Sequence, residues 1–444
     1  MGGFSALPEE LKCEIVRWVA QKSLPALASV SRQLRRLVIP RLYRCVSYNE
    51  KDAGDNNRVN TGSLICAGFA TAIPLAGGDA PLCLPSRISK LSSFLDTIVK
   101  CRHIRSHITT AGFDMFGCGP GAKADTVSKI LDLLLPSLHK LDISHVFYDF
   151  GLGTDIALKS LKVTHSLWSH RDRGNTYLFS LFRIATLRDL SIENVAEWAT
   201  YPLSYLPQHP ARLRTSNVTS LSFPTGVPVG NDLAEILFWP KALEVFELGP
   251  PTEFVTSFLS PRKLAEVLNC QQHSLRELYI VRYPYKVSWA ERNNSTLGDL
   301  HLFRALTRLC VSSHLLSDGY EKLHFNHSQT PPQIWQTLPP TIEELRLETE
   351  QVVRWLGRNM LPMSDTANEL AILLSEIARH KESRYPNLQE VVVWQPRLPK
   401  FGQALYLDHL RHSLDLLRNF KESEIRLYLS QDPKASALDR IELV

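Results

Sequence analysis

The stretch LHKLDI, residues 138–143, carries the pattern that decides the fold, because the pattern recurs along the chain. It has the form L-x-x-L-x-L, with other apolar residues replacing leucine in some copies. Alternating apolar and polar residues at its end are typical of a short strand with one buried face. The nine copies are LHKLDI (138–143), LKSLKV (158–163), LRDLSI (187–192), VTSLSF (218–223), LEVFEL (243–248), LRELYI (275–280), LTRLCV (306–311), IEELRL (342–347) and LQEVVV (388–393).

Segments with helical periodicity lie between these copies. They are DTVSKILDLLL (125–135), TYLFSLFRIA (176–185), NDLAEILF (231–238), PRKLAEVLNC (261–270), TEQVVRWLGRN (349–359) and SDTANELAILLSEIARHKESR (364–384). Each unit is therefore predicted to be a strand whose first, fourth and sixth residues point inward, followed by a helix on the outside. One unit cannot bury its own apolar face, but stacked neighbours build a continuous core. The pattern predicts an α/β fold.

This arrangement resembles a leucine-rich repeat solenoid over residues 101–444, in a divergent form. Copies start 20 residues apart at 138 and 158 but 46 apart at 342 and 388. The eighth residue after the first should be the Asn or Cys of the turn ladder. It is instead Val146, Ser166, Val195, Gly226, Pro251, Tyr283, His314, Glu350 and Pro396. The resemblance thus implies an irregular horseshoe with insertions. Unrelated βα units of another α/β fold remain the alternative.

In such a solenoid the outward residues of the strands line a concave surface that binds other proteins. These residues are Lys140, Asp142, Ser160, Lys162, Asp189, Ser191, Glu193, Ser220, Val245, Glu247, Glu277, Tyr279, Arg308, Cys310, Glu344, Arg346, Glu390, Val392 and Trp394. Tyr, Trp and Arg dominate interface energetics. The predicted target-binding residues are therefore Glu277, Tyr279, Arg308, Glu344, Arg346 and Trp394. The alternative is that charges on this face only keep it soluble.

The N-terminal stretch from Ala6 to Val46 has the signals of two or three short helices. Pro8 suits a first helical turn, and the following Glu9 and Glu10 favour the positive end of the helix dipole. Ser23 can cap a second helix. An apolar stripe continues through a predicted break near Ser31, and Pro40 is expected to end it.

The order of residues in this stretch resembles the F-box, in the form common in fungi. The resemblance rests on Leu7–Pro8, Leu11, Ile15, Leu24, Leu27, Val30–Ser31–Arg32, Arg36–Leu37, Pro40 and Leu42–Tyr43. It implies a three-helix F-box at 1–46, a strand after it, and a connecting segment with an insertion loop at 47–100. It further implies that the F-box docks a Skp-type adaptor, which links to a cullin-RING ubiquitin ligase. The implied adaptor contacts are Leu7, Pro8, Leu11, Ile15, Leu24, Leu27, Val30 and Leu34.

Two functions are compatible with this organisation. In the first, the chain is a non-catalytic substrate-recognition subunit of an SCF-type ubiquitin ligase, and the repeat region holds an unknown target protein. In the second, the chain is a binding scaffold outside any ligase, and its N-terminal helices cap the open end of the solenoid. Exposed Leu11, Ile15 and Leu27 would favour the first function, and their burial against residues 90–140 the second.

Composition narrows the environment and the partners. The net charge of +5 is mild for 444 residues, so no nucleic-acid partner is expected, although residues 1–50 carry eight Lys/Arg against four Asp/Glu. The apolar run at 64–78 contains Pro74 and is shorter than the roughly 20 residues of a membrane span, which predicts a buried loop or hairpin and no membrane association. Eight scattered cysteines without a secretory signal indicate reduced thiols in the cytoplasm or nucleus.

No motif of a catalytic, cofactor or metal site stands out. Cys101, His103, His107 and Cys118 lack the paired spacing of structural zinc ligands, and HIRSHIT (103–109) is interpreted as the first strand of the array. GCGPGAK (117–123) has no Ser or Thr after Lys123, so it is interpreted as a loop and not a phosphate cradle. The sequence predicts a protein that is no enzyme and has no cofactor.

Overall fold

The computed structural model describes two compact units, Met1–Leu190 and Ser191–Val444, which are treated separately below. The described residues are 7–19, 23–49, 86–115, 122–145, 148, 150, 156–164, 180–193, 214–225, 230–249, 259–281, 296–312, 315–316, 337–348, 363–394, 413–430 and 441–443. The expected loop at 64–78, Cys118 and most of GCGPGAK lie outside them.

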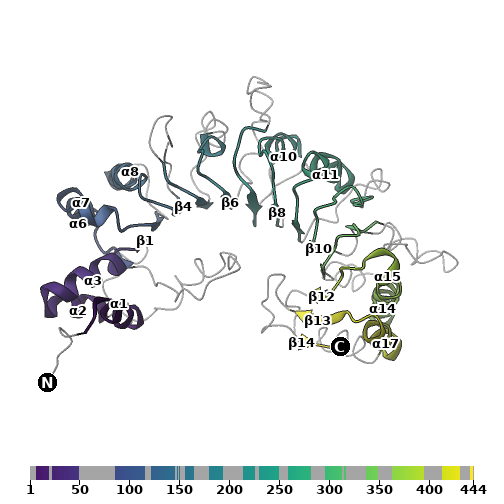
Figure 1. Ribbon diagram of the computed structural model, residues 1–444. Coiled ribbons are helices and arrows are strands. Elements are labelled where there is room, and N and C mark those ends of the chain that lie inside the picture. The colour runs from purple at the N-terminus through teal and green to yellow at the C-terminus, as the bar shows by residue number, and fades with distance from the viewer. Residues whose placement is uncertain are drawn as a thin grey trace. The chain divides into compact units, whose positions relative to one another are not determined.

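The first unit begins with three helices, α1 (Glu9–Trp18), α2 (Leu24–Val30) and α3 (Arg32–Leu42) (Figure 1). Pro8 stands at the start of α1, as expected, and Pro25 lies in the first turn of α2. The break at Ser31 is confirmed, and the Ser31 hydroxyl accepts a hydrogen bond from the Leu34 N–H at 3.1 Å, which caps α3. The expected stop at Pro40 is wrong. Pro40 lies in the last turn of α3, where its missing N–H costs the helix only one backbone hydrogen bond. The helix therefore continues and ends two residues later.

The same unit continues with strands in the order β2-β1-β3-β4-β5, each parallel to its neighbours. They are β1 (Cys45–Asn49), β2 (Ser86–Arg87), β3 (Thr110–Asp114), β4 (Lys140–Ser144) and β5 (Ser160–Thr164). Helices α6 (Leu91–Lys100), α7 (Arg102–Arg105) and α8 (Ala122–Leu134) lie on one side of these strands (Figure 1). Strand β6 (Asp189–Glu193) contains the division between the units.

The expected strand at HIRSHIT is wrong. Residues Arg102–Arg105 form the helical turn α7, which buries Ile104, and the strand begins only at Thr110. The reason is that ITTAGF (108–113) is itself a copy of the repeat pattern, with Ala111 in place of the second leucine. Ile108, Ala111 and Phe113 are all buried, as the three apolar positions of the other copies are.

After β6, the described residues of the second unit form eight strands in sequence order, β7 (Ser220–Phe223), β8 (Val245–Leu248), β9 (Glu277–Ile280), β10 (Arg308–Ser312), β11 (Glu344–Glu348), β12 (Glu390–Trp394), β13 (Arg426–Ser430) and β14 (Ile441–Glu442). Neighbours are parallel except β13 and β14, which are antiparallel. The helices of this unit are α10 (Gly230–Leu237), α11 (Pro261–Leu268) with the 3-10 turn η6 (Asn269–Gln271), α14 (Met363–Arg379), α15 (Lys381–Arg384) and α17 (Leu414–Glu422).

The nine copies of the repeat pattern all form strands, β4 to β12, and each strand begins at the third residue of its copy. Their twenty-seven apolar positions are at most 4% exposed, the maximum being Val163. Helices also form at four of the six predicted segments, as α8, α10, α11 and α14. Of the other two, 176–185 is described only from Ser180 onward, and 349–359 lies wholly outside the described residues. The α/β architecture with parallel strands is therefore confirmed and is compatible with a solenoid.

Candidate functional site

Helix α1 carries apolar side chains on two faces with different surroundings. Val16 is 3% exposed and packs with Leu24, Leu34 and Val38 in a small core. Val19, Leu27, Ala28, Leu37 and Leu42 cover this core from its sides. All members lie between residues 16 and 42, so the three helices supply this core themselves.

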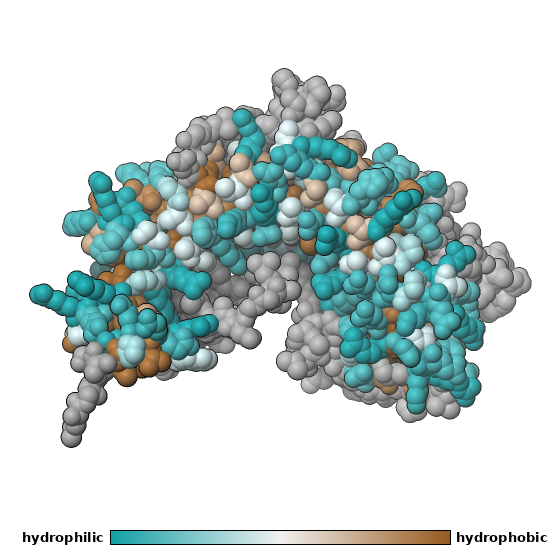
Figure 2. All heavy atoms as spheres, in the orientation of Figure 1, coloured by the Kyte–Doolittle hydropathy of each residue, from teal (hydrophilic) through white to brown (hydrophobic). Residues whose placement is uncertain are grey.

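The opposite face of α1 presents large apolar side chains to solvent. Leu11 is 52% exposed, Ile15 43% and Trp18 74%, and Val30 at the end of α2 is 70% exposed. Figure 2 shows apolar atoms gathered over these helices. Leu11, Ile15 and Trp18 are spaced by four and three residues, which places them on one side of the helix. Trp18 is held there by a hydrogen bond from Nε1 to Glu14 Oε1 at 2.9 Å. We call Leu11, Ile15, Trp18 and Val30 the exposed helical face.

The predicted adaptor contacts divide between this face and the core. Pro8, Leu11, Ile15 and Val30 are exposed, and Leu7 and Leu27 are half-buried. Leu24 at 0% and Leu34 at 6% exposure lie in the internal core, which corrects their expected place on the adaptor surface. Trp18 was absent from the predicted contacts, although its spacing from Leu11 and Ile15 was the signal that could have found it.

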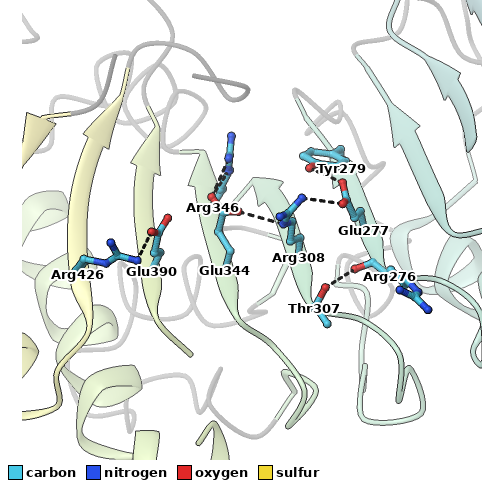
Figure 3. A network of polar contacts seen from close by, with 9 residues as sticks. All are labelled: Arg276, Glu277, Tyr279, Thr307, Arg308, Glu344, Arg346, Glu390 and Arg426. Atoms are coloured by element: carbon cyan, nitrogen blue, oxygen red, sulfur yellow. Dashed lines mark hydrogen bonds and ion pairs between the residues drawn. The ribbon is translucent and has the colours of Figure 1, made fainter. Parts of the chain in front are cut away.

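The open face of the second unit carries a row of charged side chains. The strand register places Glu277, Arg308, Glu344, Glu390 and Arg426 side by side across β9 to β13 (Figure 3). Glu277 and Arg308 are joined by an ion pair of 2.8 Å between Oε1 and Nη1. Arg308 Nε lies 3.6 Å from Glu344 Oε2, and Arg426 Nη2 lies 2.5 Å from Glu390 Oε1. We call these five residues the charged row.

Two further predicted target-binding residues, Tyr279 and Arg346, lie two residues further along their strands and hold carboxylates of this row. Arg346 holds Glu344 Oε1 with Nη2 at 2.7 Å and Nε at 2.8 Å. The Tyr279 hydroxyl donates to Glu277 Oε2 at 2.9 Å. Burial, together with the neighbouring Glu277 carboxylate, raises the pKa of Tyr279 above its ordinary value, so the phenol keeps its proton and stays a donor.

The exposure of the charged row places guanidinium groups outermost. The side chains of Arg308 and Arg426 are 49% and 51% exposed, whereas Glu277, Glu344 and Glu390 are 23%, 12% and 22% exposed. The carboxylates thus lie closer to the sheet than the guanidinium groups and fix the orientation of the arginines. Each guanidinium has five N–H donors, so both arginines can still donate to a bound molecule.

Trp394 does not belong to this exposed row, contrary to the prediction. It is 2% exposed and lies in register with Glu348 and Ser430, which are 1% and 8% exposed. Cys310 and Val392, also expected to face outward, are 1% exposed. Burial raises the pKa of the Cys310 thiol, which is therefore protonated. The face is thus covered toward the carboxyl ends of β10 to β13 and open only at their beginnings.

The described residues hold neither a membrane-spanning helix nor a metal site. None of their helices is long and apolar enough to cross a bilayer. Within the same residues, no three His, Cys, Asp or Glu side chains gather where they could hold a metal ion. The two surfaces above offer apolar contact area and hydrogen-bond donors, the means of binding a protein.

Comparison with known protein families identifies the N-terminal helices. Residues 4–39 match the F-box domain, which covers α1, α2 and most of α3. F-box domains generally bind Skp-type adaptors, and proteins that contain them are typically non-catalytic adaptors of ubiquitin ligases. No curated protein matches the chain.

Proposed function

We propose that the chain is a substrate-recognition subunit of an SCF-type cullin-RING ubiquitin ligase, present in the cytoplasm or nucleus. The F-box docks a Skp-type adaptor, and the second unit binds a target protein. The mechanism is proximity, because one chain that binds both partners raises the effective concentration of target lysines near the ligase. No catalytic step is assigned to the chain itself.

The exposed helical face carries this proposal. A fully buried Leu, Ile or Trp side chain contributes about 1.5–3 kcal/mol relative to an exposed one, so a protein that covers these residues gains several kcal/mol. Trp18 is 74% exposed beside two exposed aliphatic residues, so it adds little to the core of the folded helices. It is the residue type that most often dominates a protein interface.

A pull-down and titration with purified Skp-type adaptor tests this face. The triple variant Leu11→Ala/Ile15→Ala/Trp18→Ala should weaken binding by at least about a hundredfold. A matched control is Val99→Ala/Leu302→Ala/Ile372→Ala, whose residues are 49%, 51% and 50% exposed outside the F-box. The control should bind like wild type. Equal binding by wild type and the first variant, or no binding by either, would refute the proposed function.

We further propose that the strand–helix units form a divergent leucine-rich repeat solenoid whose open face holds the target along the charged row. The support is the register of β9 to β13, which aligns five charged side chains at about 4.8 Å intervals. Photo-crosslinking from position 277 in cell extract should capture the target. The double variant Arg308→Ala/Arg426→Ala should reduce this capture, and Arg262→Ala/Arg418→Ala, changed on exposed helix surfaces, should not.

A further inference from the structure

A row of residues stands at the edge where the strands of the first unit begin. Arg44, Thr109, His139, Lys159 and Arg188 directly precede β1, β3, β4, β5 and β6. Backbone hydrogen bonds join each to the next, from Thr109 N to Arg44 O (3.0 Å), His139 N to Thr109 O, Lys159 N to His139 O and Arg188 N to Lys159 O (2.8 Å each). The row therefore runs across the strands, and five positions span about 19 Å at strand spacing.

The segments that lead into these strands are tied to one another. The Ser137 hydroxyl before β4 donates to Arg105 O at 2.9 Å, in the segment that leads into β3. The Thr186 hydroxyl before β6 donates to Ile156 O and Leu158 O, at 2.9 and 2.8 Å, in the segment before β5. The described residues 41–44, 100–109, 137–140, 156–160 and 180–189 thus form one continuous edge, which we call the entry edge.

The charged residues of the entry edge are almost all cationic. Its cationic residues are Arg41, Arg44, Lys100, Arg102, Arg105, Lys140, Lys159, Arg183 and Arg188, with His103, His107 and His139 among them, and its single acidic residue is Asp189. The whole chain is nearly balanced, with 50 Lys/Arg and 45 Asp/Glu. At the other end of the same strands, the last residues are Asn49, Asp114, Ser144, Thr164 and Glu193, and none is Lys or Arg. At the two ends of these strands, Lys and Arg therefore stand only at the end where the strands begin.

Four of the five side chains of this row are exposed to solvent. Arg44, His139, Lys159 and Arg188 are exposed. In the described part of the chain, no side-chain hydrogen bond or ion pair engages Arg44 or Lys159, in contrast to Arg308 in the charged row of the second unit. Lys159 and Arg188 precede neighbouring strands, so their positive charges lie close together, and an anionic ligand reduces the repulsion between them.

We propose that the entry edge binds an acidic segment of a partner protein. An extended segment of about six residues matches the length of the row and directs about three carboxylates to one side. Proteins that bind single-stranded nucleic acid stack bases on aromatic side chains. The described aromatic residues of this edge, Tyr43 and Phe182, are half-buried and buried, which favours a carboxylate ligand over a nucleic acid. The inference does not depend on the function proposed above.

Fluorescence anisotropy with the full chain tests this binding directly. The probe is a labelled peptide of about ten glutamates, long enough to cross the row, compared with a glutamine peptide of equal length. The glutamate peptide should bind, and its affinity should fall as salt is added. The variant Arg44→Glu/Lys159→Glu/Arg188→Glu should weaken binding by about tenfold or more. The neutralising variant with Gln at the same positions should have an intermediate effect.

A charge-matched control excludes a general effect of net charge. Arg262→Glu/Lys263→Glu/Arg418→Glu changes three side chains that are 64%, 58% and 68% exposed on helices of the second unit. It should bind the glutamate peptide as wild type does, and all variants should keep the wild-type circular dichroism spectrum. Equal loss in the control overturns the proposal. Tighter binding of an oligouridylate of similar length would also overturn it and assign the edge to nucleic acid.

Discussion

At the scale of single residues, leucines that are equivalent in the sequence pattern have opposite roles in the F-box helices. Leu24 is fully buried in the core, and Leu11 is half-exposed on α1. We expect Leu24→Ala to cost about 2–5 kcal/mol of local stability, because it leaves a cavity, and Leu11→Ala to cost less than about 1 kcal/mol. Hydrogen–deuterium exchange over residues 24–42 should rise sharply in the first variant only. Similar exchange in both would contradict the division between core and surface.

Asp189, the one carboxylate of the entry edge, gives a pH-dependent prediction. Burial raises its pKa above the ordinary 3.8, and Lys140 offsets this in part. The folded state therefore holds the proton more tightly than the unfolded chain, so stability from this group falls as pH rises from 3.8 to the raised value. We expect Asp189→Asn to raise the free energy of unfolding at neutral pH by less than about 1 kcal/mol, because solvent screens the site, and so to raise the melting temperature. The gain should vanish below the unfolded pKa. A gain independent of pH would contradict this cause.

At the scale of elements, the strands were predictable because the same three positions point inward in every copy. The pattern failed where one of those positions changed. In β3, Ala111 replaces a leucine, and in β13 only Ile425, Leu427 and Leu429 alternate, with Glu424 where the first leucine would stand. Without β13, Arg426 could not be recognised as the partner of Glu390. Side-chain periodicity within one segment therefore predicts a strand but misses copies with substitutions.

The chain segments that follow β7 and β8 come so close that the residue directly after β8 must be glycine. A Cβ at Gly249 would lie 2.0 Å from Pro224 O and 2.5 Å from Pro224 C, both backbone atoms. Since Gly249 N donates to Phe223 O at 2.8 Å, the two segments cannot part without losing this bond. We expect Gly249→Ala to cost about 1–3 kcal/mol and lower the melting temperature by several degrees. Val245→Ala in the same strand, at a position that already has a Cβ, should cost less.

At the scale of the whole molecule, the predicted domains differ from the compact units. The sequence suggested an F-box at 1–46, a connecting segment at 47–100 and repeats over 101–444. The structure places the F-box within a unit that extends to Leu190, because β1 directly follows α3 and pairs with β3. Three residues of the exposed helical face, Leu11, Ile15 and Val30, were predictable from a motif within forty residues, and Trp18 was missed. Four residues of the charged row were also predicted to face outward, but Arg426, the ion pairs of the row and the entry edge were not, since they depend on the register of strands far apart in sequence.

Deletion of the F-box helices distinguishes the two functions, a ligase subunit or a scaffold whose N-terminal helices cap the solenoid. The core of the F-box helices comes only from residues 16–42, so deletion of residues 1–42 leaves β1 in place and uncovers few apolar side chains. We expect the truncated chain to lose adaptor binding and to keep its melting temperature within about 4 °C, equivalent to roughly 1 kcal/mol. Differential scanning calorimetry and a pull-down measure the two effects. A fall of more than about 10 °C would mean that the helices stabilise the strands beside them, as a solenoid cap does.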